Sequence, residues 1–316
     1  MLIIFQRIIV ILITFFVAGF FVTTVASWVR QSFAKNSIEY KLLSPIADPV
    51  GTSRKLIKSI TNPQKPLKNV VEEAMRGSKG DYAIVIIDLE DGETYEIQEK
   101  KTYGSASLYK LWVMAVVFDQ IEKGELKENE ILHKAIVDLN SEFDISSDSA
   151  EQQDGEIALS VAQALHQMIT ISHNYAALLL SDRIGLTNVA TFLKKNGLSH
   201  SSINQPPRTT AADIVMFYEK LYRGEIVSKS ASEKMLTLLK KQQLNDRIPK
   251  YLPKDVAVAH KTGELDYFKH DAGIVFTKNG EYVIVVLSES EFPESAAERI
   301  AQLSKAVYAY FEEKED

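Results

Sequence analysis

Strand-like and helix-like segments follow one another along the chain in an order that limits the folds open to it. Two strand-like runs come first, Tyr82–Asp88 and Thr94–Gln98, and the Asp-Gly pair between them predicts a hairpin turn. After a long helical stretch come three more strand-like runs, which cover 256–260, 272–277 and 282–287. Strands that are segregated from helices in this way indicate an α+β fold, because a parallel sheet needs strands and helices to alternate. We expect the early and late strands to join in one antiparallel sheet.

The helical stretch carries apolar residues at helical spacing. Its predicted helices are 107–123, 159–171, 174–184, 187–195, 210–222 and 230–242. The first of them is apolar nearly all round, which is typical of a helix buried inside a protein. Asn279-Gly280 predicts a second hairpin turn, and an amphipathic helix over 294–312 closes the chain. We expect the terminal helices to pack on one face of the sheet.

The N-terminus contains an uncharged segment, Ile8 to Val29, preceded by Arg7. At about 1.5 Å of rise per residue its length matches the roughly 30 Å hydrocarbon core of a bilayer. We predict an uncleaved transmembrane anchor over residues 1–29, because the segment is longer than the apolar part of a usual signal peptide, which is the alternative interpretation. Residues 30–67, interrupted by prolines, are predicted to be a linker, and residues 68–316 a single folded domain.

Composition excludes several classes of function. The net charge is −6 and no basic block occurs outside short helical faces, so nucleic acid is not an expected partner. The chain has no cysteine, which removes disulfides, thiolate nucleophiles and cysteine metal sites. Its six histidines form no HExxH or HxH pattern, and we therefore predict no metal site.

One serine and lysine pair stands where nucleophilic chemistry is favoured. Ser107 and Lys110 open the most apolar predicted helix. The hydroxyl would lie in the first turn, where free N–H groups favour negative charge, and the lysine would lie on the same face. A lysine in apolar surroundings loses its proton more easily and can act as a base toward the hydroxyl. The alternative is an N-capping serine with a solvent-exposed lysine, and a chance pair of the same spacing, Ser32 and Lys35, lies in the linker.

Two further polar motifs lie at the boundaries of predicted elements. Ser172 and Asn174 stand at the junction of two helices, where their side chains can point into a cleft or serve as helix caps. Lys261-Thr262-Gly263 follows the strand-like run 256–260. A lysine and a hydroxyl on an edge strand can bind a carboxylate, and glycine lets a ligand approach the backbone closely. The alternative interpretation of this motif is a strand that ends at glycine.

In this order the three motifs resemble the SxxK, SxN and KTG signatures of the serine penicillin-recognising enzymes, the β-lactamases and penicillin-binding proteins. The chain is most similar to the class A β-lactamases, and the resemblance covers about 68–316. It implies a five-stranded antiparallel sheet with flanking helices and an all-helical lobe. It also implies no cofactor, a monomeric catalytic domain outside the cell membrane, and a small-molecule β-lactam or a D-Ala-D-Ala peptide as substrate.

The resemblance assigns catalytic roles to four residues. It implies that Ser107 attacks the substrate carbonyl and forms an acyl-enzyme. Lys110 would be the base or part of the proton relay. Ser172, helped by Lys261, would pass a proton to the leaving nitrogen.

Substrate binding is assigned by the resemblance to the other motif residues. Asn174 would hydrogen-bond the side-chain amide of the substrate, and Thr262 with Lys261 would hold its carboxylate. Gly263 would keep the strand open to the ligand. The backbone N–H of Glu264 would complete an oxyanion hole with the N–H of Ser107. The glutamate side chain is unusual at this position, and we expect it to repel anionic substrates at the rim.

One departure from the class A pattern concerns the second half of the reaction. Class A enzymes hydrolyse the acyl-enzyme with a glutamate that precedes an asparagine by four residues. Asn204 is present in the matching segment, but His200 occupies the glutamate position, and no Asp or Glu occurs from Arg183 to Ala212. We therefore expect acylation of Ser107 to be efficient and release to be slow. One hypothesis is that the histidine replaces the glutamate as the base; a solvated loop histidine is the alternative.

Two other functions stay open at this point. The absent glutamate favours a D,D-peptidase of cell-wall metabolism, whereas the overall resemblance favours a β-lactamase. A non-hydrolytic sensor, acylated once and signalling through the anchor, is the third possibility. The roughly six residues that precede the anchor are too few for an effector, which counts against this function. His173 is a further departure, because the family usually has aspartate there; we expect a local rearrangement and no loss of chemistry.

Overall fold

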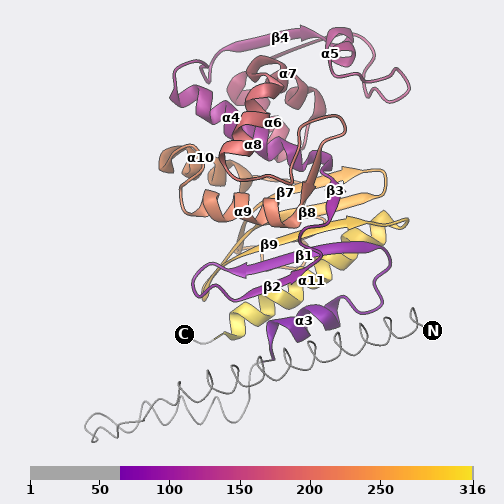
Figure 1. Ribbon diagram of the computed structural model, residues 1–316, viewed down its shortest axis with the longest axis vertical. Coiled ribbons are helices and arrows are strands. Elements are labelled where there is room, and N and C mark those ends of the chain that lie inside the picture. The colour runs from indigo at the N-terminus through magenta and orange to yellow at the C-terminus, as the bar shows by residue number, and fades with distance from the viewer. Residues whose placement is uncertain (1–64, 315–316) are drawn as a thin grey trace, which may run out of the picture. The chain divides into compact units, whose positions relative to one another are not determined.

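The computed structural model describes residues 65–314 of the chain (Figure 1). The chain divides into two units, Met1–Asn62 and Pro63–Asp316, and all described residues belong to the second. The predicted anchor over 1–29 and nearly all of the predicted linker over 30–67 lie outside the described residues. The anchor, the linker and the placement of the domain outside the membrane therefore stay predictions.

Five antiparallel strands form the main sheet, in the spatial order β2-β1-β9-β8-β7. The strands are β1 (Asp81–Asp88), β2 (Thr94–Ile97), β7 (Ala257–Leu265), β8 (Phe268–Thr277) and β9 (Gly280–Glu289). β1 pairs with β9 along its whole length, with Val85 opposite Val285, so the expected union of early and late strands is confirmed. β7 lies at one edge of the sheet, which leaves one of its sides open to other elements.

Helices cover both faces of this sheet (Figure 1). On one face, α3 (Leu67–Ala74) and α11 (Pro293–Glu313) pack against each other, as expected for the terminal helices. On the other face, α9 (Ala211–Tyr222) packs against β1 and β9. Successive residues of β1 divide between the two sides, with Ile84 in the apolar cluster under α11 and Val85 in the cluster that continues into the helices.

The remaining helices form an all-helical lobe, which is the upper part of Figure 1. They are the 3-10 turn η1 (Ala106–Tyr109), α4 (Lys110–Glu122), α5 (Ile136–Glu142), α6 (Val161–Thr170), α7 (Asn174–Ile184), α8 (Leu186–Lys195) and α10 (Lys229–Leu239). α4 lies at the centre of the lobe, because all its residues from Leu111 to Phe118 are buried. Within residues 65–314, no single helix has the length and hydropathy of a membrane span; α7 and α8 reach them only as a pair bent by 82°.

Two short ladders were not predicted from the sequence. β3 (Thr102–Gly104) pairs with β6 (Arg208–Thr210), and β4 (Ile131–Ala135) pairs with β5 (Glu156–Ser160). Strands so short or so exposed lack the apolar alternation that identifies a strand in a sequence. β7 is also longer than predicted, since every residue up to Leu265 has a partner on β8. The Lys261-Thr262-Gly263 motif therefore lies within the edge strand and not beyond its end.

Gly273 in β8 occupies a position with no room for a side chain. A Cβ there would lie 2.5 Å from the Cβ of His260 and 2.6 Å from the carbonyl oxygen of Ala259. We expect Gly273→Val to destabilise the protein by at least the ~1–3 kcal/mol typical of an overpacked core, because β7 and β8 must separate. Ile274→Val at the next residue adds no volume and should cost only about 0.5–1.5 kcal/mol. Thermal unfolding measures both, and equal losses would contradict this packing.

Candidate active site

Ser107 lies in a tight turn between β3 and α4. It belongs to the single 3-10 turn η1, so it precedes the α-helix that the sequence predicted it to open. Ala106 beside it has a φ of 43°, a left-handed value that is uncommon for residues other than glycine. Ser107 lines a cavity of about 440 Å³, called here the serine cavity, whose walls include Tyr109, Asn174 and Glu264. The turn therefore brings the hydroxyl to an open cavity.

Lys110, at the start of α4, is completely buried and fully hydrogen-bonded. Its amine donates to the carbonyl oxygen of Ser172 at 2.6 Å, to the hydroxyl of Ser172 at 3.1 Å and to Oδ1 of Asn174 at 2.6 Å. Burial lowers the pKa of Lys110 to about 7, although the charge of Glu151 acts in the opposite direction. Among the described residues no hydrogen bond links Lys110 directly to Ser107. A lysine with this pKa can exchange a proton near neutral pH.

Ser172 is the point at which two lysines meet. Its hydroxyl accepts from Lys110 at 3.1 Å and from Lys261 at 3.0 Å, and Lys261 also donates to the carbonyl oxygen of Thr262 at 2.8 Å. A hydroxyl has two acceptor lone pairs and one proton, so Ser172 can accept from both lysines and still donate. Burial, followed by the charge of Lys110, holds the pKa of Lys261 well below its usual range. The two amines and the hydroxyl between them form a path for protons.

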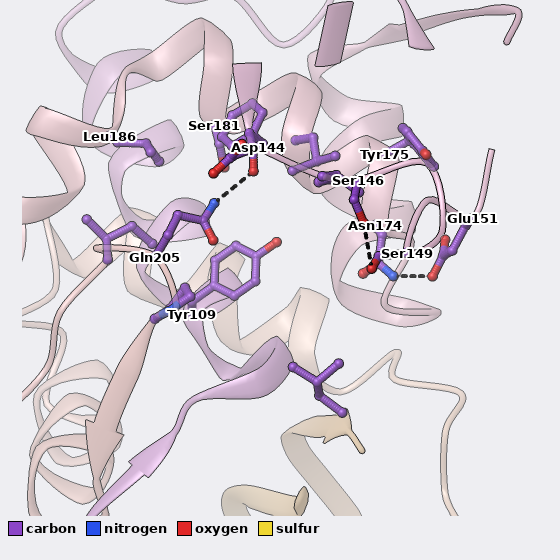
Figure 2. A pocket seen from close by; sticks show the side chains of 16 residues that line it. Tyr109, Asp144, Ser146, Ser149, Glu151, Asn174, Tyr175, Ser181, Leu186 and Gln205 are labelled. Carbon is purple, nitrogen blue, oxygen red and sulfur yellow. Dashed lines mark hydrogen bonds between the residues drawn. The ribbon is translucent and has the colours of Figure 1, made fainter. Parts of the chain in front are cut away.

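Asn174 and His173 begin α7. The imidazole Nδ1 of His173 accepts from the backbone N–H of Ala176 at 3.1 Å, so the histidine caps the helix. The local rearrangement that we expected at this position stays a prediction. Asn174 faces Lys110 with its carbonyl oxygen and donates from its amide nitrogen to Glu151 (Figure 2).

Gly263 allows β7 to pack closely against the turn that carries Ser107. A Cβ at this glycine would lie 3.2 Å from the side chains of His270 and Leu108. η1 and β7 are in contact there, and Leu108 is completely buried. Thr262 is also buried, next to Lys261 on the same strand. The structure therefore brings the first and third motifs together, as the sequence predicted.

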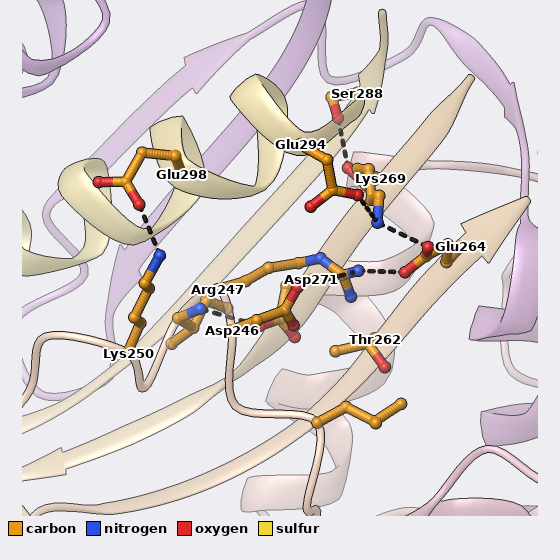
Figure 3. A network of polar contacts seen from close by, with 12 residues as sticks. Asp246, Arg247, Lys250, Thr262, Glu264, Lys269, Asp271, Ser288, Glu294 and Glu298 are labelled. Atoms are coloured by element: carbon orange, nitrogen blue, oxygen red, sulfur yellow. Dashed lines mark hydrogen bonds and ion pairs between the residues drawn. The ribbon is translucent and has the colours of Figure 1, made fainter. Parts of the chain in front are cut away.

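The side chain of Glu264 pairs with two buried cations (Figure 3). Arg247 donates to one carboxylate oxygen at 2.5 Å, and Lys269 lies 2.6 Å from the other. Burial acts to raise the pKa of this carboxyl, but the hydrogen bond from Lys269 and the charge of Arg247 outweigh it and hold the pKa below its usual range. The expected repulsion of anionic substrates is therefore weakened, because the negative charge is balanced on its own side of the cavity.

His270 of β8 is a site-supporting residue that the sequence did not reveal. Its Nε2 donates to the carbonyl oxygen of Gly104 at 2.8 Å, and its Nδ1 accepts from the backbone N–H of Ser288 at 3.0 Å. Burial lowers the pKa of His270 to about 4, so the ring is neutral at neutral pH and keeps this one tautomer. The histidine thus ties the strand before Ser107 to the sheet. A lone histidine in a strand carries no signal of this role.

His200 and Asn204 lie outside the serine cavity. The backbone N–H of His200 donates to Asp213 at 2.9 Å, and the ring Nδ1 lies 3.5 Å from the same carboxylate. The backbone N–H of Asn204 donates to the hydroxyl of Ser202 at 3.1 Å. Neither residue lines a described cavity that contains Ser107 or Asn174. The role of His200 as a base stays a prediction that this geometry does not support.

A second cavity of about 440 Å³, called here the side cavity, adjoins the serine cavity. The residues common to both cavities are Tyr109, Asn174, Pro207 and Leu265. One wall of the side cavity comes from residues 143–151, and another comes from residues 203–207 (Figure 2). Glu151 lies on the first wall and brings a carboxylate into the network of Asn174, which the motifs alone did not predict.

Comparisons with known proteins agree with this arrangement. A family model described as the Beta-lactamase enzyme family matches residues 63–311. Beta-lactamase BRO-1 of Moraxella catarrhalis is 24% identical over 79% of this chain and 87% of its own length. Extended-spectrum beta-lactamase PER-1 of Pseudomonas aeruginosa is 24% identical over 79% of this chain and 89% of its own length.

Two solved structures share the fold. A beta-lactamase from Sphaerobacter thermophilus DSM 20745 superposes with a TM-score of 0.69 at 22% identity, covering 79% of this chain and 98% of that one. PBP-A superposes with a TM-score of 0.67 at 23% identity, covering 80% of this chain and 99% of that one. The predicted α+β fold, with its five-stranded sheet and helical lobe, is confirmed.

Glu264→Gln tests the charge balance beside the cavity. The pKa of this carboxyl is lower in the folded than in the unfolded chain, so its contribution to stability is present above the unfolded value of about 4.3 and is lost as the pH falls through the folded value. The side chain is 57% exposed, so solvent screening limits the expected loss at pH 7 to about 1 kcal/mol. Thermal unfolding at pH 7 and pH 3 should show a larger Tm deficit of the variant at pH 7 than at pH 3. The control is Glu291→Gln at an exposed position; a deficit that is independent of pH would contradict this interpretation.

Proposed function

The chain belongs to the beta-lactamase enzyme family and is a serine hydrolase of that type, and we propose that it acts by forming an acyl-enzyme on Ser107. The proposed substrates are β-lactams, whose cyclic amide Ser107 would open. The observation that carries the proposal is the convergence of Lys110 and Lys261 on the hydroxyl of Ser172, beside the serine cavity. A nucleophile, a base and a proton carrier thereby lie in one small region.

Acylation requires removal of the proton of Ser107. Since the pKa of Lys110 is about 7, a large share of this lysine is uncharged near neutral pH and has a lone pair for the proton. As the oxygen of Ser107 bonds to the carbonyl carbon, its proton moves to Lys110, either directly or through Ser172. The C–N bond then breaks while the leaving nitrogen takes a proton from Ser172, which a lysine replaces. The proton lost by the nucleophile thus reaches the leaving group, and the network regains its initial charge.

Backbone N–H groups stabilise the negative oxygen that forms during this attack. Two observations support this role: η1 packs on the edge strand β7, and both Ser107 and Glu264 line the serine cavity. An edge strand has unpaired backbone groups on its open side, and these are suited to bind a developing oxyanion. Only the N–H of Glu264 is needed for this purpose. Its side chain is turned to Arg247 and Lys269, so the glutamate is compatible with the role.

Release of the acyl group lacks an evident base in the segment from Arg183 to Ala212, which contains no Asp or Glu. General-base assistance contributes typically about 10²–10⁴-fold to such a step. We therefore propose fast acylation and slow hydrolysis. The same observation favours a second candidate, a D,D-peptidase that acts on D-Ala-D-Ala peptides, and the shared fold with PBP-A is compatible with it.

A fluorescent penicillin should label the full-length protein, and Ser107→Ala should abolish the label because Ser107 is the only serine among the described residues that line the serine cavity. Gel fluorescence measures the label, and its decay after removal of free penicillin measures release. We expect the label to persist over many minutes. Release of D-Ala from a D-Ala-D-Ala peptide, measured on the same protein, tests the second candidate.

The matched control is Ser32→Ala, which removes the serine of the other SxxK pair and should leave labelling unchanged. Labelling that survives Ser107→Ala would exclude this residue as the nucleophile. Rapid hydrolysis of nitrocefin by the wild-type protein would contradict slow release.

The rate of acylation should rise with pH through about 7 and then level off, because Lys110 accepts a proton only in its uncharged form. Stopped-flow labelling between pH 5 and pH 9 measures this profile. Lys110→Ala should lower the rate by about 10²–10⁴-fold and remove the inflection. Lys123→Ala, at the exposed far end of α4, is the control. A rate that does not change with pH in the wild-type protein would contradict the role of Lys110.

A further inference from the structure

Glu151 connects a segment outside the three motifs to the catalytic lysine. It lies in the stretch between α5 and β5, where it lines the side cavity. Its carboxylate accepts from the amide nitrogen of Asn174 (Figure 2). The carbonyl oxygen of the same amide accepts from Lys110 at 2.6 Å. A continuous chain therefore runs from carboxylate to amide to amine.

We propose that Glu151 is a positioning residue for acylation, which fixes the orientation of the Asn174 amide and places a negative charge behind Lys110. The inference rests on the proposed acyl transfer at Ser107. It assigns a function to the segment 143–151, which none of the three motifs includes.

The two ends of the Asn174 amide have different partners. An asparagine side chain accepts at its oxygen and donates at its nitrogen. In this structure the oxygen of Asn174 meets the donor Lys110 and the nitrogen meets the acceptor Glu151, so each end has a complementary partner. Rotation of the amide by half a turn would set donor against donor and acceptor against acceptor. The carboxylate therefore selects one orientation and leaves the second N–H of Asn174 free to donate to a substrate.

Lys110 lies close to other ionisable side chains of the site. The charged groups near it are Lys261 on β7, which shares the hydroxyl of Ser172, and Glu151, which is linked to it through Asn174. Tyr109 is also close, but burial raises its pKa above its usual range, so it is neutral. Burial disfavours a charged Lys110, and within the described residues Glu151 is the carboxylate whose charge offsets this effect.

The two walls of the side cavity differ in the carboxylates that they carry. The wall from residues 203–207 belongs to the segment without Asp or Glu, so it brings no negative charge to this side of the site. Glu151 approaches from the facing wall. Asp144 also lines the side cavity, but its charge is not among those that shift the pKa of Lys110. Glu151 is thus the carboxylate of this cavity that is hydrogen-bonded to Asn174.

Glu151→Gln separates the charge from the hydrogen bond, because glutamine keeps an oxygen that can accept from Asn174. Loss of the negative charge lowers the pKa of Lys110, since Glu151 raises it. The acid limb of the acylation rate should therefore move to lower pH. Stopped-flow labelling of the full-length protein with a fluorescent penicillin between pH 5 and pH 9 measures the limb.

Glu151→Ala should move the limb in the same direction and also lower the rate on the plateau, because the Asn174 amide then loses its acceptor. The matched control is Asp148→Asn, which removes one negative charge from an exposed position of the same segment that does not line the side cavity. Its pH profile should equal that of the wild type. A purely structural role of Glu151 would reduce the amount of folded protein without moving the limb.

An unchanged acid limb in Glu151→Gln, with normal labelling at pH 8, would overturn the proposal. Titration of Lys110 by NMR in protein with isotope-labelled lysine gives a readout that does not depend on acylation. If penicillin fails to label the wild type, the proposed function fails, whereas the lysine titration still decides whether Glu151 acts on Lys110.

Discussion

Two buried lysines that share one hydroxyl set the conditions for the rest of this structure. Lys110 and Lys261 are both completely buried, and a buried amine is costly unless its hydrogen bonds are satisfied. Their acceptors are the hydroxyl and carbonyl oxygens of Ser172, Oδ1 of Asn174 and the carbonyl oxygen of Thr262. The two lysines and their acceptors come from α4, from the junction of α6 and α7, and from β7. The helical lobe and the sheet edge must therefore meet within hydrogen-bonding distance, or both amines lose their partners.

Close packing keeps the sheet edge and the turn of Ser107 in contact. Gly263 has no side chain, so Leu108 of η1 can lie against β7. His270, in its neutral form, bonds to Gly104 just before the turn and to the backbone of β9 behind it. Strand pairing on β8 in turn depends on Gly273, where the neighbouring strand leaves no space for a Cβ. The geometry of the nucleophile is thus supported by residues that do no chemistry themselves.

The distribution of charge supports the proposal that acylation is faster than release. Both lysines have lowered pKa values because they are buried, which suits proton transfer during the first step. Glu151 supplies negative charge to this network from the facing wall of the side cavity, through Asn174. Glu264 is held by Arg247 and Lys269 and brings no free charge to the rim. No carboxylate occurs in the segment from Arg183 to Ala212, so in the proposed reaction the release step has no general base from this segment.

The order of strands and helices, and the three motifs, were readable in the sequence because they depend on local signals. Apolar periodicity and Asn-Gly or Asp-Gly turns mark elements wherever they occur. The spacing from Ser107 to Lys110 predicted that both open one helix, but Ser107 lies in the turn η1 that precedes α4. The short ladders β3–β6 and β4–β5 left no such signal. Tertiary structure alone decided which groups meet: Lys110 turns to Ser172 and Asn174, Glu151 reaches that amide from 23 residues away, and His200 lies apart from the cavity. Contacts between distant segments depend on how whole elements pack, and no local pattern of residues records that.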